Sequence, residues 1–126
     1  MKRAIQTQNA PAPIGPYSQA VQCGNLLFVS GQIPVDAKGR LETRDIGRAT
    51  RLVMDNISAI LETAGMGMQD VVKASIFLQN MDDFPVVNDV YSSYFSHGIP
   101  PARETVQVAR LPKDAPVEIS VIAIKE

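Results

Sequence analysis

The sequence predicts an α+β fold in which about six strands form one mixed sheet and two helices cover one of its faces. Segments with strand-like and helix-like patterns follow one another in the order strand, strand, strand, helix, strand, helix, strand, strand. Most glycines and prolines fall between these segments, and no repeat or linker interrupts them. A length of 126 residues suits one core, so we expect residues 1–126 to form a single domain.

The N-terminal third carries three expected strands. A short strand precedes the proline-rich loop Ala10–Pro16. The segments Ser18–Gln22 and Leu26–Ile33 are expected to pair, because Gly24 and Asn25 between them tolerate the positive φ of a tight turn.

Two segments have the spacing of amphipathic helices. Asp45–Ala64 places its apolar residues along one stripe, and Asp45 suits the positive N-terminal end of a helix. The second helix is expected to begin after Asp82 or Asp83, which would cap it, and to run to about Phe95.

Three further segments complete the expected sheet: Val71–Gln79, Arg103–Ala109 and Val117–Lys125. The first and last of these are too apolar on both faces for a fully solvated surface. Because the helices are expected to cover only one face, we expect a homo-oligomer to cover the other.

Composition and charge favour a cytoplasmic globular protein. Apolar residues make up 45% of the chain, and the formal net charge of −1 argues weakly against nucleic acid as the main partner. The single cysteine, Cys23, excludes an intrachain disulfide and a zinc site built from cysteine pairs. No apolar run follows the basic start of the chain, so we expect neither a signal peptide nor a membrane span.

Arg103 and Glu118 are the most informative pair, because each begins the polar face of one of the last two strands. If these strands form a hairpin, the two charges would line one concave site. An arginine at a strand start is more often a solvated edge residue, and a cross-strand pair of this kind usually contributes little energy. A carboxylate in so apolar a strand nevertheless needs a partner or a task.

The chemistry of this pair suits hydrolysis of a small substrate that bears a carboxylate. Arginine binds a carboxylate through two parallel hydrogen bonds, and glutamate can orient or deprotonate a water. Tyr17, Ser30 and Asn88 are secondary candidates, each with an equally ordinary structural interpretation. The sequence lacks a phosphate loop, a dinucleotide glycine pattern, a zinc signature and a Ser-His-Asp arrangement, so we expect a mechanism without cofactor or metal.

Five blocks of the sequence resemble the RidA (YjgF) family, whose members are also called L-PSP endoribonucleases or translation initiation inhibitors. The blocks follow in the family's order and span nearly the whole chain: Ala12–Ala20, Ser30–Pro34, Pro101–Arg103, Leu111–Asp114 and Val117–Ile119. The resemblance implies a chorismate-mutase-like fold and a homotrimer with active sites between subunits. It also implies hydrolysis of 2-aminoacrylate and 2-aminocrotonate, the reactive enamines released by pyridoxal-phosphate-dependent dehydratases, to 2-keto acids and ammonia.

By matching position, the resemblance implies that Arg103 binds the substrate carboxylate and that Glu118 positions the attacking water. It implies that the pocket is lined by Tyr17, Ser30 and Asn88. Thr105 stands where many bacterial members have a cysteine, so a thiolate nucleophile at this position is impossible. The backbone N–H and C=O of Thr105 remain as expected substrate contacts.

Two other functions stay open at this point. One is a non-catalytic regulatory or RNA-acting member. A ribonuclease would want two acid/base groups near a basic groove, whereas this chain has one histidine and a net charge near zero. A deaminase for a larger imine is the other alternative, which the volume around Asn88 and Thr105 would distinguish.

Overall fold

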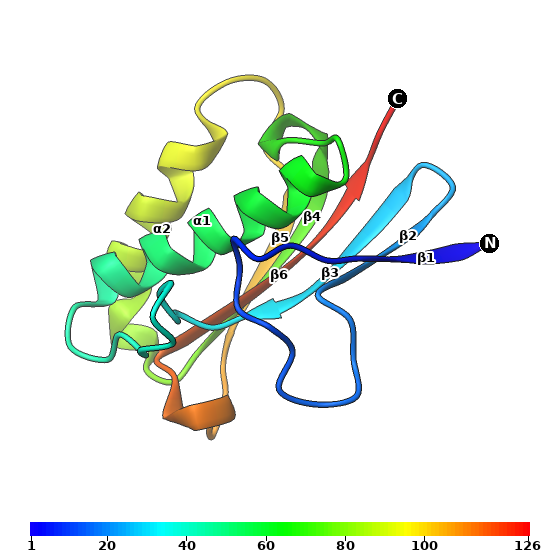
Figure 1. Cartoon of the computed structure of the whole chain (residues 1–126). Coiled ribbons are helices and arrows are strands. Elements are labelled where there is room, and N and C mark those ends of the chain that lie inside the picture. The colour runs from blue at the N-terminus through cyan, green and yellow to red at the C-terminus, as the bar shows by residue number, and fades with distance from the viewer.

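The computed structural model describes all 126 residues, and its six strands form one sheet against which two α-helices pack (Figure 1). The predicted α+β class, with both helices on one face of a mixed sheet, is confirmed. The elements are β1 (Lys2–Ile5), β2 (Ala20–Cys23), β3 (Leu26–Gln32), α1 (Ile46–Thr63), β4 (Val71–Leu78), α2 (Phe84–Ser92), β5 (Ala102–Gln107) and β6 (Val117–Ile124).

The order of strands across the sheet is β1-β2-β3-β6-β4-β5. All neighbours are antiparallel except β4 and β5, which run parallel and are connected through α2. A hairpin between the last two strands is therefore wrong, because β4 lies between β5 and β6 and pairs with both. β6 instead lies between β3 and β4, where every second side chain is buried at the centre of the sheet.

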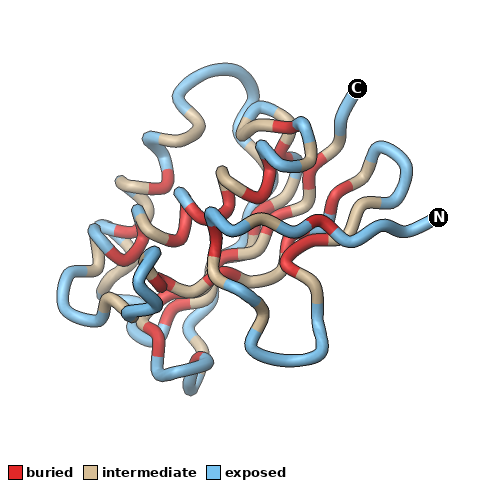
Figure 2. Tube along the Cα trace, viewed as in Figure 1, coloured by how far each residue is buried: buried red, intermediate tan, exposed pale blue.

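Helix α1 contributes six of the 22 residues of the buried core cluster, more than any other element. Asp45 caps it as expected, with a side-chain oxygen that accepts a hydrogen bond from the backbone N–H of Arg48 at 3.1 Å. Its inward stripe packs on β3 and β6, and Figure 2 shows buried residues concentrated where this helix meets the sheet. None of the helices combines the length and apolar character needed to cross a bilayer.

Helix α2 is shorter than the sequence predicted. It ends at Ser92, and a short 3-10 turn, Ser93–Phe95, takes the place of its last turn. It begins after Asp83, but the side chain of Asp83 makes no capping hydrogen bond. Asn80 instead accepts a bond from the backbone N–H of Asp82 and caps the short turn that precedes α2.

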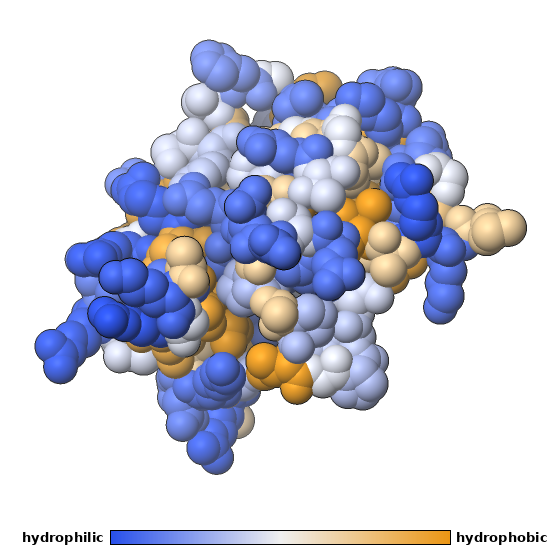
Figure 3. Space-filling view, viewed as in Figure 1, coloured by the Kyte–Doolittle hydropathy of each residue, from blue (hydrophilic) through white to orange (hydrophobic).

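The face of the sheet away from the helices carries much apolar surface. Burial alternates along β6, so that every second side chain is only partly covered. The partly exposed apolar side chains on this open face are Leu26, Phe28, Phe77, Val106, Ile122 and Ile124. By contrast, hydrophilic side chains predominate on the helix side, which Figure 3 shows. Association through the open face stays a prediction.

Candidate functional site

Arg103 and Glu118 lie on opposite faces of the sheet. Across β5, β4 and β6, Arg103 is in register with Ala74 and Val121, whose side chains are buried beneath the helices. Glu118 is in register with Phe77, and the alternation of side chains places both on the open face. The expectation that the two charges line one site within a single chain is therefore wrong.

Arg103 extends from the edge strand β5 against one side of α2. Its Nη1 donates a hydrogen bond to Asn88 Oδ1 at 2.6 Å. The guanidinium carbon lies 5.5 Å from the ring centroid of Phe84 and 5.1 Å from that of Tyr91. No acidic side chain pairs with this arginine, so its positive charge is held by neutral groups and is available to an anion.

Two buried hydroxyls without partners lie on the same helix-facing side. Thr105 follows Arg103 by two residues on β5, and its Oγ1 has no hydrogen-bond partner. The hydroxyl of Tyr91 is also buried and unpaired. Burial raises the pKa of Tyr91, an effect that the charge of Arg103 opposes. Because buried hydroxyls usually find a partner, these two mark an unusual part of the fold.

The carboxylate of Glu118 lies directly over Gly31. The pairing of β3 with β6 shifts between Val29 and Gln32, so Gly31 sits in this irregular stretch. A Cβ added to Gly31 would lie 2.7 Å from Glu118 Cδ, so glycine is what leaves room for the carboxylate. Burial raises the pKa of Glu118 above the ordinary 4.5, and no hydrogen bond or ion pair opposes that rise.

Ser30 and Tyr17 lie on the same part of the chain, but their hydroxyls make local hydrogen bonds. Ser30 Oγ donates to the carbonyl of Ser18 at 2.6 Å. The hydroxyl of Tyr17 accepts a bond from the backbone N–H of Ile14 at 3.3 Å. Tyr17 is 48% exposed, which leaves most of its ring edge available to a ligand or to another chain.

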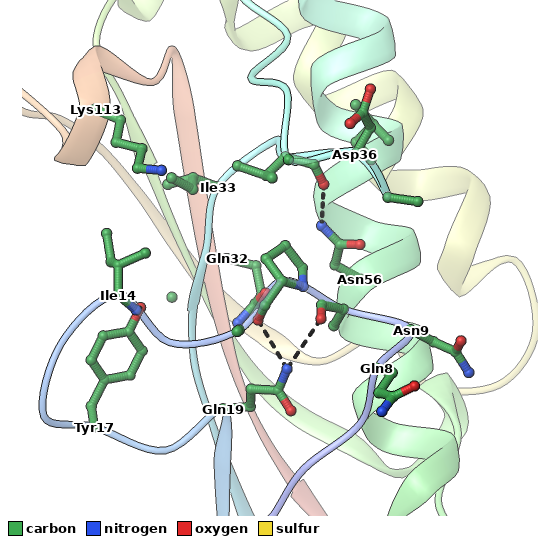
Figure 4. A pocket seen from close by; sticks show the side chains of 18 residues that line it. Gln8, Asn9, Ile14, Tyr17, Gln19, Gln32, Ile33, Asp36, Asn56 and Lys113 are labelled. Carbon is green, nitrogen blue, oxygen red and sulfur yellow. Dashed lines mark hydrogen bonds between the residues drawn. The ribbon is translucent and has the colours of Figure 1, made fainter.

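A cavity of about 720 Å³ opens between the N-terminal loop, the end of β3 and α1. Tyr17 and Gly31 line it, and Lys113 reaches it from the loop before β6 (Figure 4). Across the cavity from Tyr17, the side chain of Asn56 projects from α1 and donates to the carbonyl of Val35 at 3.1 Å. The volume lies within the range of small-molecule sites.

Gln19 ties the N-terminal loop to the sheet and so shapes this cavity. Its amide nitrogen donates to the carbonyls of Thr7 and Pro11 at 3.0 and 2.9 Å, and its amide oxygen accepts from the backbone N–H of Thr7 at 2.7 Å. Sequence analysis missed this buried glutamine, and its place between Ser18 and Ala20 offers no signal for such a role.

The predicted site residues thus fall into two clusters. The arginine cluster, on the helix side of β5, contains Arg103, Asn88 and Thr105. The glutamate cluster contains Glu118 and the adjoining segments that carry Ser30 and Tyr17. Sequence analysis did not predict that Phe84 and Tyr91 contact Arg103. Their positions at i and i+7 around Asn88 place all three on one side of a helix, which was a usable signal.

One six-stranded mixed sheet, two helices on one face and a charged cluster on each side define a small α+β protein with an uncovered sheet face. Residues 7–125 match the family model described as Endoribonuclease L-PSP, and the chain belongs to this family. The resemblance noted from the sequence blocks is thereby confirmed.

Individual relatives agree over almost the whole chain. A RutC family protein of Pyrococcus horikoshii is 53% identical and covers 100% of both chains. The 2-iminobutanoate/2-iminopropanoate deaminase of Escherichia coli is 44% identical and covers 99% of both. A crystal structure of E. coli TdcF with bound serine superposes with a TM-score of 0.94 at 41% identity, covering 98% of this chain and 99% of that one. The comparisons therefore show the family and its fold, and the chain has relatives that carry a deaminase name.

Proposed function

We propose that this protein hydrolyses small 2-imino acids and their 2-enamino tautomers to 2-keto acids and ammonia. The observation that carries the proposal is the guanidinium of Arg103, held by neutral groups and free to pair with a substrate carboxylate. The deaminase name of the E. coli relative supports the reaction, and the serine bound by TdcF supports a small ligand with a carboxylate. The substrates would come from pyridoxal-phosphate-dependent dehydratases.

In this proposal Arg103 fixes the carboxylate end of the substrate. A guanidinium has five N–H donors, of which Asn88 occupies one, so enough remain for a two-pronged contact. Thr105 would contribute its backbone groups from the exposed edge of β5. Asn88 would act through Arg103, by holding it in place.

Glu118 would position the water that attacks the substrate. The enamine first tautomerises to the imine, water oxygen then adds to the imine carbon, and a proton from that water passes by way of the carboxylate to nitrogen. The remaining proton of the new hydroxyl group then passes to nitrogen as the C–N bond breaks, so that ammonia leaves and the 2-keto acid remains, and the proposed steps need no cofactor or metal. A carboxylate with a raised pKa is a better base than an ordinary glutamate. Tyr17 and Ser30 would line the pocket around this water.

A complete site needs a second subunit in this proposal. The open face presents apolar side chains beside Glu118, which favours association of the kind expected for a homotrimer. Association of sheets would bring the glutamate cluster of one subunit to the arginine cluster of its neighbour. The cavity beside Tyr17 and Gly31 would then form the approach to the shared site.

The proposal is tested by coupling threonine dehydratase to the purified protein and following the decay of the enamine and imine by absorbance. Wild-type protein is expected to speed this decay above the rate in buffer, and Arg103→Ala is expected to lose the acceleration. Arg103→Lys is the matched control, because it keeps the charge but not the two-pronged geometry, and it should retain little activity. A wild-type rate equal to that in buffer would exclude small enamines as substrates, and bulkier imines would be screened next.

Gly31→Ala is expected to lower the rate of imine hydrolysis by about ten-fold or more, because the new methyl group would displace the Glu118 carboxylate from its place over Gly31. The thermal midpoint should fall only slightly although the activity falls strongly, since Gly31 is only partly buried. The measurement is kcat alongside thermal unfolding. Gly47→Ala, in the first turn of α1, controls for the loss of a glycine, because Gly47 has no positive φ and an added Cβ would meet no atom closer than 3.4 Å. Full activity in Gly31→Ala would mean that the position of Glu118 is unimportant.

The family's description raises RNA cleavage as the alternative activity. One hollow of about 430 Å³ beside the start of α1 gathers arginines, but it holds as many carboxylates: Asp36, Arg40, Glu42, Arg48, Arg51 and Asp55. Such a balanced set provides no excess positive charge for a phosphate backbone. This hollow therefore gives no support to RNA cleavage, whereas the unpaired guanidinium of Arg103 favours the deaminase.

A further inference from the structure

The aromatic bed beneath Arg103 stands out among the features that the proposed chemistry does not use. Tyr91 is 4% exposed and belongs to the main core, and its ring also packs on Phe95 with centroids 4.8 Å apart. Phe84 is only partly buried and lies at the start of the helix. Of the two rings that contact Arg103, that of Tyr91 is therefore the more rigidly held.

A flexible arginine on an exposed edge strand would lose conformational freedom when it binds a ligand. The face of an aromatic ring attracts a guanidinium and holds it in one plane. The amide of Asn88 then fixes the rotation of the guanidinium within that plane through the 2.6 Å bond. Neither neighbour carries a charge, so the arginine is oriented without being neutralised.

The hydroxyl of Tyr91 takes no part in this arrangement. It is buried and makes no hydrogen bond, so it contributes nothing that a phenylalanine would lack. The ring and the hydroxyl can therefore be separated by substitution.

We propose that the ring of Tyr91 is a positioning element for Arg103, which it holds through a cation–π contact in the orientation that receives the substrate carboxylate. This inference rests on the proposed function for the identity of the ligand. The orientation of the guanidinium itself is independent of that function.

The test compares Tyr91→Phe with Tyr91→Leu. Tyr91→Leu is expected to raise KM for the imine about ten-fold with a smaller change in kcat, because a lost cation–π contact weakens carboxylate binding. Tyr91→Phe is expected to keep the wild-type KM. Tyr94→Leu is the matched control, since it removes a nearby tyrosine ring whose hydroxyl bonds to Asp55 at 2.8 Å and which has no contact with Arg103.

A second readout does not depend on catalysis. The Nε proton of Arg103 should show a ring-current shift in the NMR spectrum of wild type and Tyr91→Phe, and Tyr91→Leu should lose part of it. If wild type hydrolyses no imine, the proposed function fails while this shift still decides whether Tyr91 orients Arg103. An unchanged shift and KM in Tyr91→Leu, or equal losses in Tyr91→Phe, would overturn the proposal.

Because Tyr91 packs in the core, Tyr91→Leu could fail to fold. Two further proteins carry either phenylalanine or 3,4,5-trifluorophenylalanine at position 91. Both keep the ring in place, and fluorine weakens the negative face of the second ring. KM is expected to be higher with the fluorinated ring than with phenylalanine. Equal KM values for these two rings would exclude the cation–π contact as the cause.

Discussion

In the proposed homotrimer, assemblies that contain both Arg103→Ala and Glu118→Gln subunits are expected to recover about a third of the wild-type rate of imine hydrolysis, although neither variant is active alone. Each variant by itself should lose about a hundred-fold or more, because each lacks one essential group in every site. Recovery is expected because the two residues lie on opposite faces of one sheet, so a site that uses both must take them from two subunits.

The size of the recovery follows from the composition of a mixed trimer. In a cyclic trimer that contains both kinds of subunit, about one site in three receives an intact Arg103 from one subunit and an intact Glu118 from its neighbour. The trimers can be formed by joint refolding or by joint expression with two different affinity tags. The rate is then measured on the fraction that carries both tags.

A matched control uses the same procedure. Mixing Arg103→Ala with the double variant Arg103→Ala/Glu118→Gln provides no intact arginine, so no activity should return. If the first mixture also stays inactive while mixed trimers demonstrably form, the shared-site arrangement is wrong. Activity in the double-tagged fraction above that of either parent would support it.

Glu118→Gln is expected to be more stable than wild type at neutral pH while it loses activity. The carboxylate of Glu118 is partly buried and has no partner that opposes the rise of its pKa, so its ionised form destabilises the folded state. Replacing it with a neutral amide should raise the free energy of unfolding by roughly 1 kcal/mol, or about 4 °C in Tm. This value is at the low end of the cost of an unsatisfied buried group, because Glu118 is only partly buried.

The pH dependence of this gain has a defined sign. The pKa of Glu118 is raised in the folded state, so the folded chain binds the proton more tightly than the unfolded chain does. Wild-type stability should therefore improve as the pH falls through the raised pKa. The advantage of Glu118→Gln is greatest above that pKa and disappears below the ordinary value of 4.5. Thermal unfolding between acid and neutral pH at one protein concentration measures it.

Glu104→Gln is the matched control on the same open face. A hydrogen bond from Ser75 and a contact with Lys73 at 3.0 Å lower the pKa of Glu104, which is the opposite direction. Its stabilising contribution is present above the unfolded pKa and is lost as the pH falls through the lowered one. Glu104→Gln should therefore bring no gain at neutral pH. If Glu118→Gln is less stable than wild type instead, Glu118 has a charged partner in the assembled protein.

The sequence by itself determined most of the elements of this protein and indicated its candidate chemistry. Helical spacing placed α1 and its Asp45 cap, because a period of 3.6 is read within one segment. The alternation of apolar residues placed β6. The residue types of Arg103 and Glu118 indicated a carboxylate-binding group and a base without reference to any contact.

Only the tertiary structure decided which face each charge occupies. Alternation relates residues within one strand, whereas the choice of face depends on which strands pair and in what register. The connection from β4 through α2 to β5 favours a parallel pair, but it leaves the other edge of β5 free and therefore does not exclude a final hairpin. The place of β6 between β3 and β4 has no such local signal, because it follows from burying its apolar side chains at the centre of the sheet. For the same reason the rings beneath Arg103 and the carboxylate over Gly31 emerged only when distant segments packed together.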